Sequence, residues 1–219
     1  MTVQEIMAQL EALGSAKVRE LNVRNDAPEN HFGVKMGDIR TIAKAIRSNH
    51  TLGMELWQTG NADAMILATL VIKPKLLSSA ELQQMVQSIT YAQLADTLIT
   101  NVVKLYPDKE ALRLQWMETE HAMLARAAWS LTTERVCKNP FGLEIAALLD
   151  RIESELASAP PATQWTMNFC LGEIGINFPE HRDRAIKIGE AVGLYKDWPL
   201  SKGCIPPYVP VWVPAIVNK

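Results

Sequence analysis

Cysteine is scarce in this sequence. The 219 residues include three cysteines, Cys137, Cys170 and Cys204, which lie far apart and form no Cys-x-x-Cys pair. A disulfide framework uses cysteines in even numbers, and a structural zinc site uses closely spaced ligands. The sequence therefore predicts reduced thiols and no metal site.

Long hydrophobic runs are also missing. No apolar stretch approaches the roughly 18 residues that cross a bilayer. Residues 1–14 have the spacing of an amphipathic helix and carry Glu5 and Glu11, unlike the basic and then apolar start of a signal peptide. We expect no membrane partner and a cytoplasmic location.

An excess of positive charge is absent. The formal net charge is −2 and the sequence pI is about 6.1. This balance is mild evidence against non-specific binding of nucleic acid, although a local basic stripe can lie within a neutral total.

The common catalytic fingerprints are missing as well. The sequence has no Walker loop, dinucleotide fingerprint, nucleophile elbow or His-Glu-x-x-His motif, and its four histidines are scattered. We therefore expect no cofactor.

Helical periodicity is what the sequence has in abundance. Val3, Ile6, Met7, Leu10 and Leu13 share one stripe, and Ile39, Ile42, Ala43 and Ile46 share another. No convincing alternation with period two occurs, so a sheet is not expected. Further helices are predicted at Leu52–Gln58, Ala62–Ile72, Ala80–Ser88, Tyr91–Leu105, Lys109–Glu118, Ala122–Val136, Gly142–Leu156, Ala162–Ile176 and Glu180–Val192.

Short connections between so many helices predict the fold class. Breakers such as Gly60-Asn61 and Pro160-Pro161 separate the helices, and no long polar linker divides the chain. We predict an all-α protein, an α-solenoid of about six antiparallel HEAT-like helix pairs with a concave face, in a single domain over 1–219. No crisp internal repeat is visible, so a compact irregular α-domain is the alternative.

The C-terminal segment, 195–219, has a different character. It is rich in proline, which argues against a regular helix. It also carries Trp198, Tyr208 and Trp212, which a disordered tail would rarely contain. We predict an irregular, ordered strap packed over the last helices.

Two charged residues stand in stretches that are otherwise almost wholly apolar. Asp96 lies within Tyr91–Val103, and Arg126 lies within Ala122–Leu131. A helix that is apolar on nearly every face is usually buried, and an unpaired buried charge costs several kcal/mol. We predict that both charges are paired, placed in a cleft or used in function. A mutual salt bridge between them is the purely structural interpretation.

Basic residues gather near one predicted helix. Arg40, Lys44 and Arg47 are three and four residues apart and so share a helix face, and Lys35 precedes them. One interpretation is an ordinary solvated surface. The other is a stripe that contacts phosphates on the inner wall of a curved solenoid.

Several short motifs in order resemble a known family. Residues 31–40, His-Phe-Gly-Val-Lys-Met-Gly-Asp-Ile-Arg, followed by Ala43-Lys44, resemble the start of AlkD-like DNA alkylation-repair proteins. Residues 56–61, Leu-Trp-Gln-Thr-Gly-Asn, are similar to the same family's Leu-Trp-x-Ser-Gly link. Residues 171–175, Leu-Gly-Glu-Ile-Gly, and 202–204, Lys-Gly-Cys, are also similar, so the resemblance covers most of the chain from about residue 30.

The resemblance implies a HEAT-like solenoid whose concave face holds duplex DNA. Characterised members are glycosylases of base excision repair that release cationic N3- or N7-alkylated purines without drawing the base into a pocket, unlike the general base-flipping enzymes. Because the leaving group is already cationic, a carboxylate that stabilises the deoxyribose cation is the main requirement. Asp96 matches the family's catalytic aspartate, and Arg126 matches its phosphate-contacting arginine.

The aromatic positions depart from the family pattern. The family tryptophan four residues before the aspartate is Ala92 here, with Tyr91 next to it. Phe169 takes the place of the second aromatic, with Trp165 one turn earlier. Trp129 is a further candidate for an aromatic cleft. Core packing is the structural interpretation of these tryptophans.

Three functions remain open from the sequence. The first is a monomeric DNA-repair glycosylase acting on duplex DNA that is alkylated or branched. The second is a DNA-binding relative without catalysis, because Ala92 replaces the family tryptophan. The third is a protein-interaction scaffold, a common use of α-solenoids.

Overall fold

The computed structural model describes residues 1–218 and is helical, with no strand among them. This confirms the predicted all-α class. The chain forms two compact units, Met1–Lys109 and Glu110–Lys219. A single domain over the whole chain stays a prediction. No helix in the described part is both long and apolar enough to cross a membrane.

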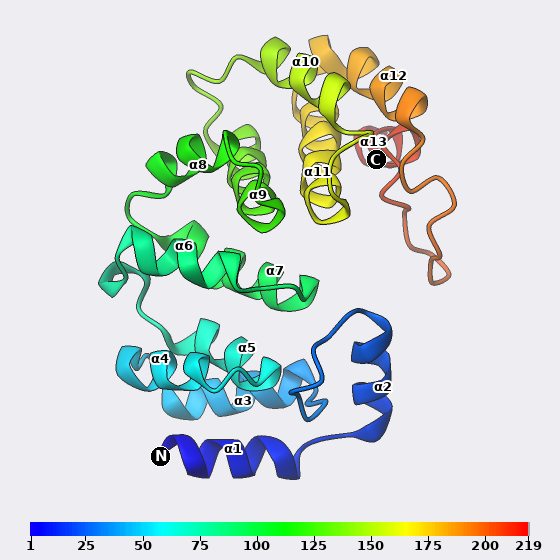
Figure 1. Ribbon diagram of the computed structural model, residues 1–219. Coiled ribbons are helices and arrows are strands. Elements are labelled where there is room, and N and C mark those ends of the chain that lie inside the picture. Colours follow the sequence, from blue (N-terminus) through cyan, green and yellow to red (C-terminus); the bar gives the residue numbers. More distant parts are fainter. Residues whose placement is uncertain (219) are drawn as a thin grey trace. The chain divides into compact units, whose positions relative to one another are not determined.

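The first unit is built around one buried helix, α5 (Ala62–Val71). All but one of its ten residues are buried, and it packs on α4 (His50–Gln58), α3 (Met36–Ile46) and α7 (Ala92–Asn101), as Figure 1 shows. The remaining elements of this unit are α1 (Val3–Ala12), α2 (Ala16–Arg24), the 3₁₀ helix η1 (Pro74–Leu76), α6 (Ser79–Gln87) and the 3₁₀ helix η2 (Val103–Leu105).

A buried carboxylate fixes the segment before α3. Asp63, in the first turn of α5, accepts hydrogen bonds from the backbone N–H groups of Phe32 at 2.7 Å, Gly33 at 3.0 Å and Val34 at 3.3 Å. Gly33 has φ +77° and lies against the backbone of Arg19, where a Cβ atom would clash. The Gly-Val motif therefore has a structural role, because it positions the start of α3.

The second unit is built around α11 (Pro161–Asn177). This helix packs on α9 (Ala122–Lys138), α12 (Arg182–Val192), α13 (Val209–Val217) and α10 (Ile145–Glu155). Its other elements are α8 (Lys109–Met117), which begins at the boundary between the units, and the 3₁₀ helix η3 (Pro179–His181).

The end of the chain corrects one prediction. Residues 209–217 form the regular helix α13 in place of an irregular strap. Pro210 lies in the first turn, where a backbone nitrogen has no intrahelical acceptor to lose. Pro214 removes one further bond, and the helix still closes with the N–H of Asn218 donating to the Pro214 carbonyl at 3.1 Å. The connection from α12 to α13, residues 193–208, is irregular as predicted.

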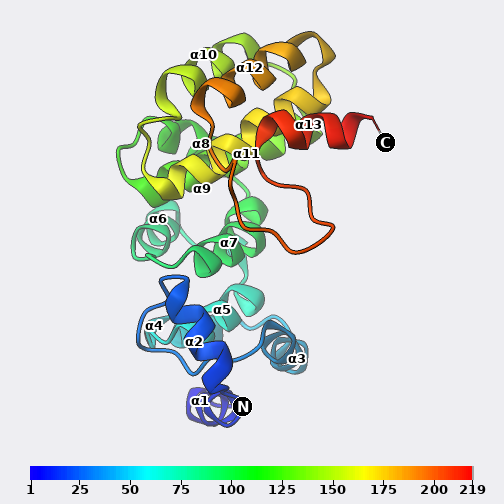
Figure 2. The same cartoon turned by 90° about the vertical axis from the view of Figure 1, so that its right-hand side faces the viewer.

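Packing against α11 explains why α13 forms. A Cβ atom added at Gly172 would lie 2.5 Å from Cε3 of Trp212, and one at Gly175 would lie 3.0 Å from Cγ2 of Val213. Helix α13 lies beside α11 (Figures 1 and 2), in the space that the two glycines leave. The Leu-Gly-Glu-Ile-Gly motif therefore serves close helix packing.

Two other local predictions were incomplete. The helix predicted at Tyr91–Leu105 is shorter, because Tyr91 is its N-cap and α7 ends at Asn101 before η2. Helix α2 was not predicted, since none of its residues is buried and the sequence offers no apolar stripe there.

Candidate nucleic-acid interface

Asp96 lies on the exposed face of α7. Leu94, Ala95, Leu98 and Ile99 of this helix are buried, whereas Ala92, Asp96 and Thr100, spaced four residues apart, are exposed. The expectation that the helix around Asp96 is buried on nearly every face was therefore wrong. The apolar residues that follow Asn101 lie outside the helix, so α7 is amphipathic rather than apolar all round.

Tyr91 does not lie on that face. Its side chain is 3% exposed, and its hydroxyl donates to Oε1 of Gln93 at 2.6 Å. Burial raises the pKa of Tyr91. The exposed surface next to Asp96 at position 92 carries only the methyl group of Ala92, so the tyrosine does not take the place of the family tryptophan.

Arg126 is a buried charge, as predicted. It lies on α9 and is 3% exposed, and its Nη1 donates to the carbonyl of Ala162 at 2.9 Å. Its positive charge also lowers the pKa of Tyr195, although burial, the larger effect, raises it. Arg126 therefore holds the first turn of α11 and lies near the connection from α12 to α13.

The candidate aromatic residues divide into two groups. Trp129 is 2% exposed, and the guanidinium of Arg151 lies 5.9 Å from its ring centre, which is core packing with a cation–π contact. Trp165 and Phe169 are half-buried on α11, with ring centres 5.1 Å apart. The structure thus places Trp165 and Phe169, but not Trp129 or Tyr91, at the surface.

The predicted basic stripe is exposed on α3. Ile39 and Ile42 face the core, while Arg40, Lys44 and Arg47 are exposed, as is Lys35 at the N-cap. Within residues 1–218, none of these four cations has a hydrogen bond or ion pair to an acidic side chain.

Two arginines of the second unit have acidic partners instead. Arg184 pairs with Asp150 at 2.6 Å and with Glu153 at 2.7 Å. Arg151 pairs with Glu118 at 3.2 Å and with Glu155 at 3.0 Å. These two arginines are neutralised by their acidic partners, whereas the cations of α3 are not.

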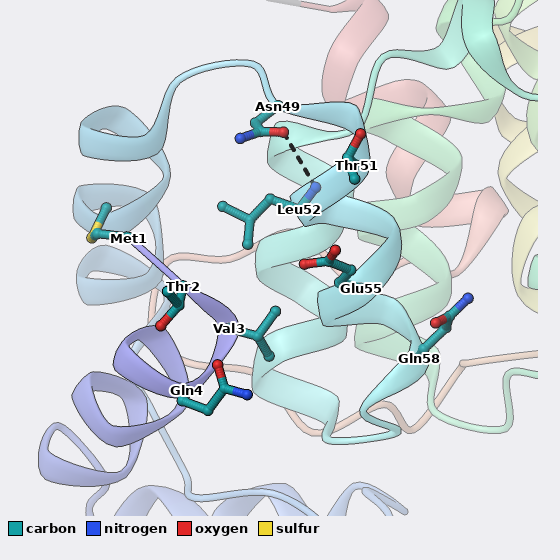
Figure 3. Close-up of a pocket in the computed structure, with 9 residues that line it drawn as sticks. All are labelled: Met1, Thr2, Val3, Gln4, Asn49, Thr51, Leu52, Glu55 and Gln58. Atoms are coloured by element: carbon teal, nitrogen blue, oxygen red, sulfur yellow. Dashed lines mark hydrogen bonds between the residues drawn. The ribbon is translucent and has the colours of Figure 1, made fainter.

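A separate open pocket of about 700 Å³ lies between the start of α1 and α4 (Figure 3). The charged groups among its lining residues are the carboxylate of Glu55 and the amino group of Met1. Because these two charges are opposite, the pocket has no preference for a phosphate group. The lining residues are Met1, Thr2, Val3, Gln4, Asn49, Thr51, Leu52, Glu55 and Gln58.

The contacts among the aromatic residues of the second unit were not predicted from the sequence. Tyr195 and Trp198, from the connection between α12 and α13, contact Trp165, and Trp212 of α13 contacts Phe169. The prediction that residues 195–219 pack over the last helices was a partial signal for these contacts. The spacing of Gly172 and Gly175 on α11 was the signal for the site where α13 docks.

These features define a class of protein: a helical-repeat protein with a local cationic surface. The model of a family described as "DNA alkylation repair enzyme" matches residues 6–193. The chain belongs to this family.

Two relatives and one solved structure extend the comparison. The proteins named "Uncharacterized protein Lin0241", from Listeria innocua, and "Uncharacterized protein Lmo0209", from Listeria monocytogenes, are 24% and 22% identical over 198 residues, covering 88% of this chain and 87% of each relative. The solved structure is of "a new family of proteins related to the HEAT-like repeat DNA glycosylases with affinity for branched DNA structures". It has 26% identity and a TM-score of 0.78, covering 88% of this chain and 83% of that one. The predicted HEAT-like α-solenoid fold is thereby confirmed.

Proposed function

We propose that this protein binds duplex or branched DNA in DNA repair through the cationic face of α3. The observation that carries the proposal is that Lys35, Arg40, Lys44 and Arg47 are exposed on one helix and lack acidic partners in the described chain. Phosphate contacts from such side chains supply most of the affinity for DNA irrespective of sequence. Membership of the repair family and the branched-DNA affinity of the structural neighbour support the same function.

Excision of cationic alkylpurines is the second candidate function. Asp96 is exposed, and a carboxylate at the surface can approach the deoxyribose of a bound duplex and stabilise its developing positive charge. The phosphate-contacting role of Arg126 is part of this proposal. Ala92 weighs against efficient catalysis, because the exposed position one turn before Asp96 has no aromatic ring.

DNA binding is tested by fluorescence anisotropy with a duplex and a four-way branched DNA. We expect the double variant Arg40→Gln, Lys44→Gln to bind about tenfold or more weakly, because each charge-assisted contact is worth about 1 kcal/mol or more. The control Lys187→Gln removes an exposed lysine of α12 and should bind like wild type. Equal loss in both variants, or no binding by wild type at low salt, would reject the proposal in favour of a protein scaffold.

Excision is tested by release of 7-methylguanine from methylated DNA. We expect Asp96→Asn to abolish any release, Ala92→Trp to increase it, and Asp108→Asn, an exposed aspartate outside α7, to leave it unchanged. Binding without release by wild type and by Ala92→Trp would identify a non-catalytic DNA-binding relative.

A further inference from the structure

Five aromatic side chains form a continuous cluster on the second unit. Trp165 of α11 has ring-centre distances of 5.4 Å to Tyr195 and 5.5 Å to Trp198, and Tyr195 and Trp198 are 5.2 Å apart. Phe169 lies 5.1 Å from Trp165 and 4.9 Å from Trp212. The cluster thus joins α11, α13 and the connection between α12 and α13, which leaves the helices as a loop (Figure 2).

Trp198 is the exposed member of this cluster. Its side chain is 43% exposed, whereas the other four are half-buried. Trp165 and Tyr195 both contact its ring, and part of the residue stays exposed to solvent. A core tryptophan would not keep so much of its surface in water.

The backbone holds Trp198 in place at a cost. Tyr195 has φ +63°, a left-handed conformation that bulky residues rarely adopt. A turn follows, in which the N–H of Trp198 donates to the Tyr195 carbonyl at 3.2 Å. Strained backbone of this kind is concentrated at functional positions. The turn thus fixes Trp198 close to Tyr195.

Basic residues flank Trp198 in the sequence. Lys196 and Lys202 are exposed and make no ion pair in the described part of the chain, and Asp197 is the one acidic residue between them. Arg126 lies close enough to Tyr195 to influence its ionisation. Aromatic rings combined with cations are the chemistry of sites for unpaired nucleic acid, where bases stack and phosphates meet basic side chains.

We propose that Trp198, supported by Tyr195 and Trp165, is a stacking platform for an unpaired base of DNA. A paired base inside a duplex has both faces covered by its neighbours, so only an unpaired or extruded base offers a face to the ring. The protein would therefore prefer DNA with an unpaired base, such as one at a bulge or branch point, over plain duplex. This inference rests on the proposed DNA binding.

The test compares a plain duplex with the same duplex carrying one extrahelical 2-aminopurine. Wild type should bind the bulged DNA more tightly and quench the 2-aminopurine fluorescence by stacking. Trp198→Ala should lose about 5- to 150-fold in affinity for the bulged DNA, the range expected for one stacked base, and little for the duplex. Trp198→Phe keeps a ring and should recover most of the loss.

Phe141→Ala is the matched control. Phe141 is an 89% exposed aromatic of the same unit, on the turn between α9 and α10, and it should affect neither DNA. Circular dichroism melting verifies that each variant is folded. An equal loss on both DNAs, or no loss, in Trp198→Ala would overturn the platform while leaving DNA binding intact. If wild type bound neither DNA, both the proposed DNA binding and this inference would be rejected.

Discussion

Asp96 and Ala92 are neighbours on the exposed face of α7, one turn apart. Their residue types were predicted to matter from the sequence, but their exposure was not. The apolar residues beyond Asn101 lie where the helix has already ended, so they do not make α7 apolar on every face. The consequence for chemistry is that the carboxylate is accessible but has no ring beside it at position 92, which favours binding over efficient excision.

Arg47 combines backbone strain with positive charge. It ends α3 at φ +63° and ψ −156°, a region that is essentially restricted to glycine. We expect Arg47→Gly to raise the free energy of unfolding by about 1 kcal/mol, because relief of about 1–3 kcal/mol of strain exceeds the entropic cost of glycine. The same substitution should weaken DNA binding. Urea unfolding and anisotropy measure the two effects.

Arg47→Ala separates strain from charge at this position. Alanine keeps the Cβ atom and therefore the strain, so this variant should bind DNA as weakly as Arg47→Gly without any gain in stability. If Arg47→Gly leaves DNA affinity unchanged, this end of α3 does not contact DNA.

The cysteines should differ sharply in reactivity. Cys170 is buried in α11, and burial raises its pKa to about 12, so at pH 8 it stays a protonated thiol. Cys137 and Cys204 are exposed. We expect a thiol reagent at pH 8 to label these two in the folded protein and Cys170 only after unfolding, as measured by mass spectrometry. Labelling of Cys170 at the rate of Cys204 would contradict its burial.

At the scale of elements, the position of α13 depends on small residues of its neighbours. Gly172 admits the Trp212 ring, and Gly189 of α12 admits Val209, whose Cβ would lie 2.9 Å from an added Cβ. We expect Gly172→Ala to destabilise the protein by about 1–3 kcal/mol through overpacking, with a change in tryptophan fluorescence as Trp212 moves. Thermal and urea unfolding provide the measurement.

Gly37→Ala is the matched control for that substitution. Gly37 also lies in a helix, but an added Cβ would meet no atom within 4 Å. Alanine should therefore stabilise α3 by about 0.5–1 kcal/mol through its higher helix propensity. If both variants were stabilised alike, Gly172 would not be a packing site.

Most elements could be predicted from the sequence, and the two failures have physical causes. Helix α3 has a clear apolar stripe, and α5 has a nearly continuous apolar run that begins after the capping residue Asn61. Helix α2 buries no residue, so periodicity could not find it. Helix α13 forms despite Pro210 and Pro214, because tertiary packing on Gly172 outweighs a poor local propensity.

At the scale of the whole molecule, the family and fold were accessible from sequence because ordered motifs have structural roles. The Gly-Val motif positions α3 through Asp63, and Gly60 takes φ +66° before Asn61 caps α5. The aromatic cluster was not accessible, because it joins residues of α11 to residues 30 or more positions later. Such contacts depend on tertiary packing, which no local pattern reports.

The net charge of the protein and the local charge of α3 lead to opposite expectations for DNA binding. The salt dependence of the DNA affinity distinguishes them. At a net charge of −2, the molecule as a whole does not attract DNA, so the proposed binding requires local phosphate contacts. A plot of the logarithm of the DNA association constant against the logarithm of salt concentration should be linear. Four phosphate contacts from α3 predict a slope of about −3 to −4 in this plot. The Arg40→Gln substitution should reduce the magnitude of this slope by about one, whereas Lys187→Gln should leave the slope unchanged. A slope near zero would contradict phosphate binding, and an unchanged slope in Arg40→Gln would place the contacts elsewhere.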